Sequence, residues 1–140
     1  MKFMVFVKAN KESEAGVMPD EHILSEMSKY NEELVKAGVL LDGGGLQPTA
    51  RAARVRFQGR QRTVIEGPFM EAKDLVAGYW LLECKSLAEC VEWVKRCPNP
   101  SGGESEVEIR PLFGTEDFSA ANAETIERNE RILAQARAQS

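Results

Sequence analysis

Two short segments that are apolar on both of their alternating faces constrain the fold most strongly. Residues 2–8 (KFMVFVK) and 78–84 (GYWLLEC) carry large apolar side chains at both odd and even positions. Neighbouring side chains of a β-strand point to opposite faces of the sheet, so strands of this kind must be covered on both sides. Both segments are therefore predicted to be central strands of one sheet.

Two amphipathic segments are predicted to be the helices that pack on this sheet. Between residues 19 and 38, apolar positions recur at the spacing of one helix face, and Gly38 suits a C-terminal cap. Residues 86–97 repeat this pattern, and Ser86 and Glu89 have the spacing of a capping box. Each segment follows one of the two predicted central strands along the chain.

The order of the remaining segments indicates the fold class. We predict a short strand and glycine turn over 39–48, a hairpin over 54–65, a strand over 106–113 and a thinly apolar helix over 119–138. This order is typical of an α+β, ferredoxin-like split βαβ sandwich with an inserted β-hairpin and a C-terminal helix. Two helices cover only one face of the sheet, so the C-terminal helix or a second subunit must cover the other. A homodimer that pairs sheet to sheet would do so, and we predict one.

Composition excludes several classes of protein. A net charge of −4 argues against a general polyanion binder, and no sequence-specific binding of nucleic acid is expected. The N-terminal apolar run is too short for a signal peptide or a membrane span, so a cytoplasmic protein without membrane contacts is predicted. Three cysteines without a C-x-x-C pair and a single histidine indicate neither a disulfide framework nor a metal site. No cofactor is predicted.

His22 and Asp42 are the first candidates for acid–base chemistry. His22 is expected at the boundary of the first helix, where it is either a solvated first-turn side chain or, with a carboxylate such as Asp42 in reach, a proton-transfer group. The segment DGGGLQP around Asp42 matches no phosphate-binding motif and is interpreted as a turn.

Five arginines fall within residues 51–62, in the predicted hairpin of an acidic chain. They either protect an edge hairpin from aggregation or contact an acidic partner. Glutamates of the last helix are an intramolecular alternative.

Residues 66–73 (EGPFMEAK) are the strongest candidate for a positioned loop. Gly67 and Pro68 predict a stiff turn, and Phe69 is expected to anchor it in the core. One hypothesis is a structural corner whose polar residues line a ligand cleft; the alternative is a turn with a Glu–Lys surface pair. The cleft is expected between the sheet and the helices. Its predicted polar and aromatic lining consists of Tyr30, Glu66, Glu71, Lys73, Tyr79 and Trp80.

Long motifs in the chain resemble a known family. Residues 64–98 (VIEGPFMEAKDLVAGYWLLECKSLAECVEWVKRCP) and 30–50 (YNEELVKAGVLLDGGGLQPTA) are similar to DGPF-type, YCII-related proteins. The resemblance implies a dimeric α+β barrel, a domain over residues 1–113 and a helical extension over 114–140. Glu66 stands where the family usually has aspartate.

What the resemblance implies about function is open between two classes. Some relatives carry a His–Asp dyad proposed to be catalytic, and the corresponding positions here hold Met27 and Cys97, so that chemistry is not expected. One class is a small-molecule-binding or enzyme-like dimer, with His22, Asp42 and Glu66 as its candidate catalytic residues. The other is an accessory interaction module that works with an extracytoplasmic-function sigma factor, because DGPF-type proteins are often encoded beside one.

Overall fold

The computed structural model describes residues 1–99, 103–117 and 123–139, apart from the side chains of Lys73 and Thr115. The strands are β1 (Lys2–Lys8), β2 (Leu40–Gly45), β3 (Ala53–Gln58), β4 (Gln61–Glu66), β5 (Val76–Glu83) and β6 (Val107–Pro111). The α-helices are α1 (Lys11–Glu14), α2 (Glu21–Lys36), α3 (Leu87–Lys95) and α4 (Ala123–Gln139). Short 3-10 helices are η1 (Thr49–Arg51), η2 (Ala72–Asp74) and η3 (Thr115–Asp117).

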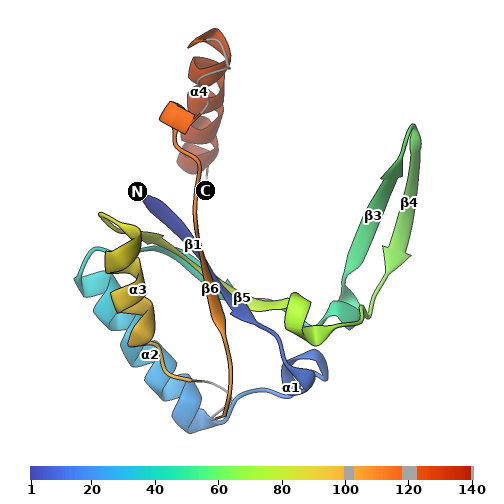
Figure 1. Ribbon diagram of the computed structural model, residues 1–140, viewed down its shortest axis with the longest axis vertical. Helices are drawn as coiled ribbons and strands as arrows, with labels where there is room; N and C mark the ends of the chain where they lie inside the picture. Colours follow the sequence, from blue (N-terminus) through green and yellow to red (C-terminus); the bar gives the residue numbers. More distant parts are fainter. Residues whose placement is uncertain (100–102, 118–122, 140) are drawn as a thin grey trace.

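Four antiparallel strands form the main sheet in the order β2-β5-β1-β6. Val5 of β1 lies opposite Trp80 of β5 on one side and opposite Ile109 of β6 on the other. This is the strand order of a ferredoxin-like fold, so the predicted α+β class and the two central strands are confirmed. The predicted hairpin forms a separate two-stranded sheet, β3–β4, that projects away from the main sheet (Figure 1).

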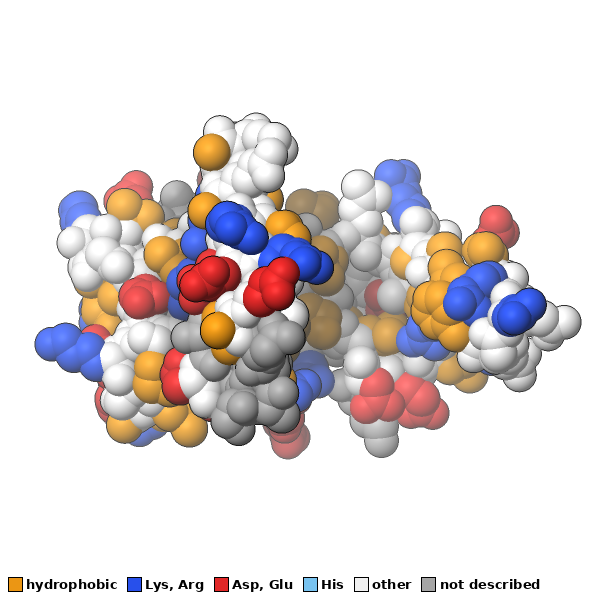
Figure 2. Space-filling view, turned by 90° about the horizontal axis from the view of Figure 1, so that it is seen from above, with side chains coloured by type: hydrophobic (Ala, Val, Ile, Leu, Met, Phe, Trp, Pro, Cys, Tyr) orange, Lys and Arg blue, Asp and Glu red, His pale blue; other side chains and the backbone are white. Residues whose placement is uncertain are grey.

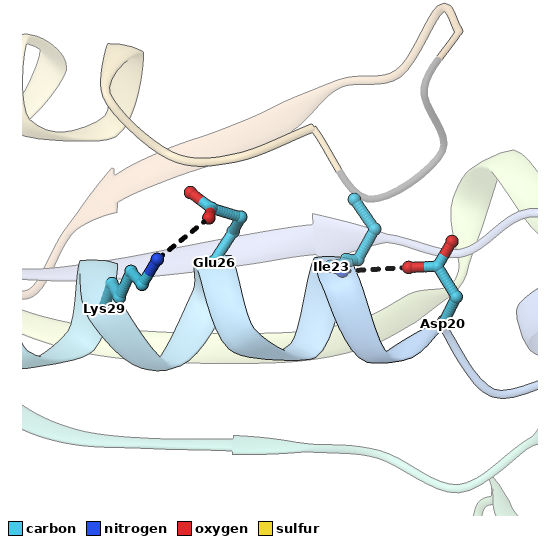
Figure 3. Close-up of polar contacts among 4 residues, drawn as sticks. All are labelled: Asp20, Ile23, Glu26 and Lys29. Atoms are coloured by element: carbon cyan, nitrogen blue, oxygen red, sulfur yellow. Dashed lines mark hydrogen bonds and ion pairs between the residues drawn. The ribbon is translucent and has the colours of Figure 1, made fainter.

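Local signals explain where α2 begins and ends. The Asp20 carboxylate accepts a hydrogen bond from the Ile23 backbone N–H at 2.9 Å, which caps the helix (Figure 3). Glu26 and Lys29 form an ion pair at 3.4 Å one turn later. After the helix, Gly38 has a φ of +73°, a left-handed conformation that glycine adopts without strain.

The hydrophobic core lies between the sheet and the layer formed by α2 and α3 (Figure 1). Its centre is aromatic: the Tyr30 and Trp80 rings meet edge to face with their centroids 5.6 Å apart. The indole N–H of Trp80 donates a hydrogen bond to Asn31 Oδ1 at 2.9 Å. The buried residues of this cluster are Phe3, Val5, Tyr30, Leu34, Val39, Trp80, Leu82, Cys84 and Cys90.

The opposite face of the sheet, which we call the open face, is only partly covered in the single chain. Met4 lies opposite Leu81, and Phe6 lies opposite Tyr79, so these four side chains share that face of β1 and β5. All four are half-buried, whereas Phe3 and Val5 on the helix side are fully buried. In Figure 1, α4 extends past the end of the sheet, so it does not replace the missing layer.

One α-helix was not predicted from the sequence. The single-turn α1 follows β1 and is capped by Asn10, whose side chain accepts a hydrogen bond from the Ser13 backbone N–H at 2.8 Å. A four-residue helix has no apolar periodicity, so the Asn10–Ser13 spacing was its available signal. The predicted start of the last helix at residue 119 lies outside the described residues.

Substitutions of two neighbouring residues test which face of α2 packs against the core. Leu34→Ala is expected to lower the free energy of unfolding by about 2–5 kcal/mol, because Leu34 is fully buried. Val35→Ala is the matched control: Val35 is the next residue of α2 and 61% exposed, so its loss should cost less than about 0.5 kcal/mol. Urea denaturation measures both, and equal losses would contradict the assigned helix face.

Candidate functional site

The corner formed by residues 66–73 is tied to two distant parts of the chain through Thr49. The Thr49 hydroxyl donates a hydrogen bond to Glu14 Oε2 at 2.5 Å and accepts one from the Phe69 backbone N–H at 3.0 Å. The Thr49 backbone N–H donates to Glu14 Oε1 at 3.2 Å. Glu14 and Thr49 were absent from the predicted site, and they connect α1, η1 and the corner.

Gly67 and Phe69 give the corner its shape. A Cβ atom on Gly67 would overlap the Thr49 carbonyl oxygen, so the backbone approach requires glycine. The Gly67 N–H donates to the Ala52 carbonyl at 2.9 Å. Phe69 is half-buried, and the Arg54 guanidinium lies 3.8 Å from its ring centroid. The ring therefore anchors the base of the hairpin and not the central core, where it was expected.

Two polar residues of the corner face solvent. Glu66 and Glu71 are exposed, and the Lys73 side chain lies outside the described part of the structure. Two shallow grooves lie elsewhere: one of about 310 Å³ on the outer face of α2, and one of about 390 Å³ between α3 and β6. A ligand role for Glu66, Gly67, Pro68, Phe69, Glu71 and Lys73 stays a prediction.

The three candidate catalytic residues do not come together. His22 is exposed in the first turn of α2, on the helix side of the sheet. Asp42 lies opposite Leu81, which places it on the open face, and Glu66 ends β4 in the projecting hairpin. The carboxylate of Asp42 instead accepts hydrogen bonds from the Gly43 N–H at 2.8 Å and from the Tyr79 hydroxyl at 3.4 Å.

The space between the sheet and the helices, where a cleft was predicted, is filled by core side chains. Tyr30 is buried there, and its hydroxyl donates to the Trp93 carbonyl at 2.8 Å. Burial raises the pKa of the Tyr30 phenol well above its usual range, so it stays protonated. Tyr79 lies on the opposite face of the sheet, so the two tyrosines cannot line one cleft. The prediction also placed Tyr79 and Trp80 in one cleft. These residues are neighbours on β5, and neighbouring side chains of a strand point to opposite faces of the sheet.

The three free cysteines are not activated nucleophiles. Burial raises the pKa of Cys90 to about 12 and that of Cys97 to about 11, which disfavours the reactive thiolate at neutral pH. Cys97 and Met27 both pack against the core. In the described residues, no group of three or more His, Cys, Asp or Glu side chains is placed to hold a metal ion. None of the described helices has the length and apolar character needed to span a bilayer.

On the open face, the side chains of Phe6, Tyr79 and Asp42 and the backbone of Gly44 form a surface that we call the aromatic shelf. Asp42 and Tyr79 are its polar part. The Tyr79 ring lies over Gly44, where a Cβ would come within 3.6 Å of the ring, and Phe6 is its cross-strand neighbour. The glycines of β2 therefore leave room for the ring and put no side chain above it. The shelf combines half-buried apolar surface with one carboxylate and one hydroxyl, and these two groups can accept and donate hydrogen bonds. The glycine-rich segment thus provides close packing and not a phosphate loop.

A methyl group at Gly67 should break the corner. Gly67→Ala is expected to lower the free energy of unfolding by about 1–3 kcal/mol or more, because the new atom meets the backbone of Thr49. Gly45→Ala is the control, since a Cβ there meets no heavy atom within 4 Å, and it should change stability by less than about 0.5 kcal/mol. Thermal unfolding compares the two. Equal melting temperatures would show that the Thr49 contact is not rigid.

The family match and one relative agree with the sequence resemblance. The model of the YCII-related domain matches residues 1–113. An uncharacterised protein of Rhizobium meliloti (strain 1021) is 32% identical over 93 residues, which is 66% of this chain and 75% of the relative. A solved structure of 5-chloro-2-hydroxyhydroquinone dehydrochlorinase from Burkholderia phenoliruptrix AC1100, in complex with 2,5-dihydroxybenzoquinone, has 16% sequence identity and a TM-score of 0.47. The structural match covers 84% of this chain and 98% of the dehydrochlorinase chain. From the family match and the relative, this chain belongs to the YCII-related domain family.

Proposed function

We propose that the chain is a small-molecule-binding or enzyme-like homodimer, in which two open faces meet and enclose a ligand against the aromatic shelf. The observation that carries the proposal is the half-buried apolar surface of Met4, Phe6, Tyr79 and Leu81 on the two central strands. Large apolar side chains on central strands are stabilised by a second layer, and a second copy of the sheet supplies one. The Lys8–Glu108 ion pair at 3.3 Å gives this surface a polar rim.

A ligand on the shelf would meet the chemistry that small-molecule sites commonly offer. Such sites are mostly apolar and contain few polar groups that fix orientation. The Tyr79 ring would stack on a flat apolar ligand, and the Asp42 carboxylate would accept a hydrogen bond from a ligand hydroxyl or amine. The Tyr79–Asp42 hydrogen bond is long at 3.4 Å, so a ligand donor could replace it at low cost. If the dimer is an enzyme, Asp42 is the proton acceptor beside the Tyr79 ring.

Three narrower statements belong to the same proposal. The chain is of the DGPF type within its family, it acts in the cytoplasm, and residues 114–140 form an extension that is separate from the domain. The resemblance of residues 64–98 supports the first. The corner at residues 66–73 would stiffen the base of the hairpin.

The alternative is an interaction module that works with a sigma factor. The exposed apolar and arginine side chains of the β3–β4 hairpin favour protein contact of some kind. This alternative requires the hairpin to be accessible in the dimer. It is distinguished from the first proposal by whether a second copy of the chain covers the hairpin.

A fragment screen by methyl NMR tests ligand binding directly. Small flat aromatic alcohols should shift the methyl signals of Met4 and Leu81, because these side chains flank the shelf. Asp42→Asn should weaken such binding by about 1 kcal/mol, or roughly fivefold, because a hydrogen bond to a neutral amide is weaker than one to a carboxylate.

Glu92→Gln is the control, because Glu92 is an exposed carboxylate on α3 with a side chain that is 71% exposed. It should leave fragment affinity unchanged. Shifts that gather at Val91, Val94 and Val107 would move the site to the groove between α3 and β6 and refute the shelf.

A further inference from the structure

The charged side chains of the open face are divided unequally between the two halves of the main sheet. On β2 and β5, the charged residues that point to this face are Asp42 and Glu83, so this half, which we call the acidic half, has a formal charge of −2. The half made of β1 and β6, which we call the basic half, carries three cations and one carboxylate, a formal charge of +2. Its charged residues are Lys2, Lys8, Glu108 and Arg110.

The arginines of the β3–β4 hairpin are not part of this pattern. The hairpin forms a sheet of its own, and Figure 2 shows its basic side chains beside hydrophobic ones at the right of the view. The acidic and basic halves are therefore defined by the four strands of the main sheet alone.

Asp42 and Arg110 lack full charge compensation within the chain. Glu108 lies 3.3 Å from the Lys8 ammonium and 3.9 Å from Arg110 Nε, so one carboxylate serves two cations. The Asp42 carboxylate accepts hydrogen bonds from a backbone N–H and a tyrosine hydroxyl, which are both uncharged. Among the described residues, the basic half thus has a cation in excess, and the acidic half has a carboxylate without an ion pair.

Cross-strand register joins Asp42 and Arg110 into one row of side chains that runs across the open face. In strand order, the row is Asp42, Leu81, Met4 and Arg110. It has a carboxylate at one edge of the sheet, a guanidinium at the other, and two apolar side chains between them. Three strand spacings of about 4.8 Å each separate the two ends, so the charged groups do not meet within one chain.

The neighbouring row repeats this order of charge. Glu83 of β5 lies opposite Lys2 of β1, so the acid is again on the acidic half and the base on the basic half. Glu83 also lies 3.6 Å from the terminal ammonium of Met1, but both groups are about half exposed, and ion pairs of this kind are weak.

This pattern makes the open face complementary to a rotated copy of itself. Two sheets that pack face to face can be related by a two-fold axis that runs across the strands or along them. An axis across the strands places each strand over its own copy, so that acidic half faces acidic half. An axis along the strands, on the midline of the sheet, places β2 over β6 and β5 over β1 of the second copy. Each acidic half then faces a basic half, and because like charges in an interface are strongly unfavourable, this second axis is favoured.

The spacing of packed sheets suits a contact between the two ends of the row. Packed sheets lie about 10 Å apart, and their strands are rotated by about 30°. This rotation shifts facing residues at the edges by a few ångströms, which the long and flexible side chain of Arg110 can follow. On the midline, the same axis brings Met4 over the apolar Leu81 of the second copy.

We propose that a second copy covers the open face by rotation about an axis along the strands, so that Arg110 of the partner subunit forms an ion pair with Asp42. This pair rests on the homodimer of the proposed function and deepens it. The partner subunit then contributes a residue to the aromatic shelf, and the shelf is complete only in the dimer. Two-fold symmetry produces the pair twice, once at each edge of the interface.

Charge reversal at the two positions tests the pair. D42R and R110D should each raise the dissociation constant of the dimer at least about tenfold, because each places like charges opposite each other at two symmetric points. The double variant D42R/R110D restores opposite charges across the interface and should return to within about threefold of the wild type. Both positions are exposed in the single chain, so circular dichroism should show folded variants.

Glu92→Arg is the matched control, because it makes the same change of charge at an exposed carboxylate on α3, which packs on the other face of the sheet. It should leave the dissociation constant unchanged. Asp42→Asn and Arg110→Gln repeat the cycle without adding a charge. Once either is present, the other should have little further effect, because both remove the same pair.

Sedimentation equilibrium measures these constants and separates the pair from the dimer itself. A dimer that D42R and R110D do not weaken, or one in which their losses add in the double variant, overturns the pair and leaves the homodimer in place. A wild type that is monomeric at micromolar concentration overturns both.

Discussion

The pairing of β1 with β5 is the interaction on which the rest of the structure depends. Both strands carry large side chains on both faces, so their cross-strand pairs create two apolar surfaces from one ladder. The helices α2 and α3 bury one of them, where Phe3, Val5 and Leu82 are almost fully excluded from water. The other surface keeps a partial exposure that burial in a second layer would remove. Both the proposed dimer and the proposed ligand shelf follow from this asymmetry.

The corner at residues 66–73 shows how a short motif serves the fold. Its backbone approaches Thr49 so closely that only glycine fits at position 67, and Glu14 holds Thr49 in place. These contacts fasten the base of the hairpin to α1 and η1. A rigid base matters if the hairpin acts as an arm, because the direction of the arm is then set before a partner is met.

Periodicity in the sequence predicted the elements well and the site poorly. The strands β1 and β5 and the helices α2 and α3 were predictable because apolar spacing and capping residues are local signals. The Thr49 contacts were not, because they join residues 35 and 20 positions apart in the chain. The separation of Tyr30 from Tyr79 depends on which face of the sheet each side chain takes, and strand alternation alone could have supplied that for Tyr79 and Trp80. The half-buried position of Phe69 depends on where the hairpin packs, which no local pattern contains.

The central claim is that a second copy of the chain covers the open face, and sedimentation equilibrium of the wild type and of Phe6→Asp tests it most directly. The wild type should sediment at twice the 15.6 kDa mass of one chain. Phe6→Asp should remain folded by circular dichroism but sediment as a monomer, because dimerisation would bury an unpaired carboxylate. A monomeric wild type, or a Phe6→Asp variant that is as dimeric as the wild type, would contradict the account.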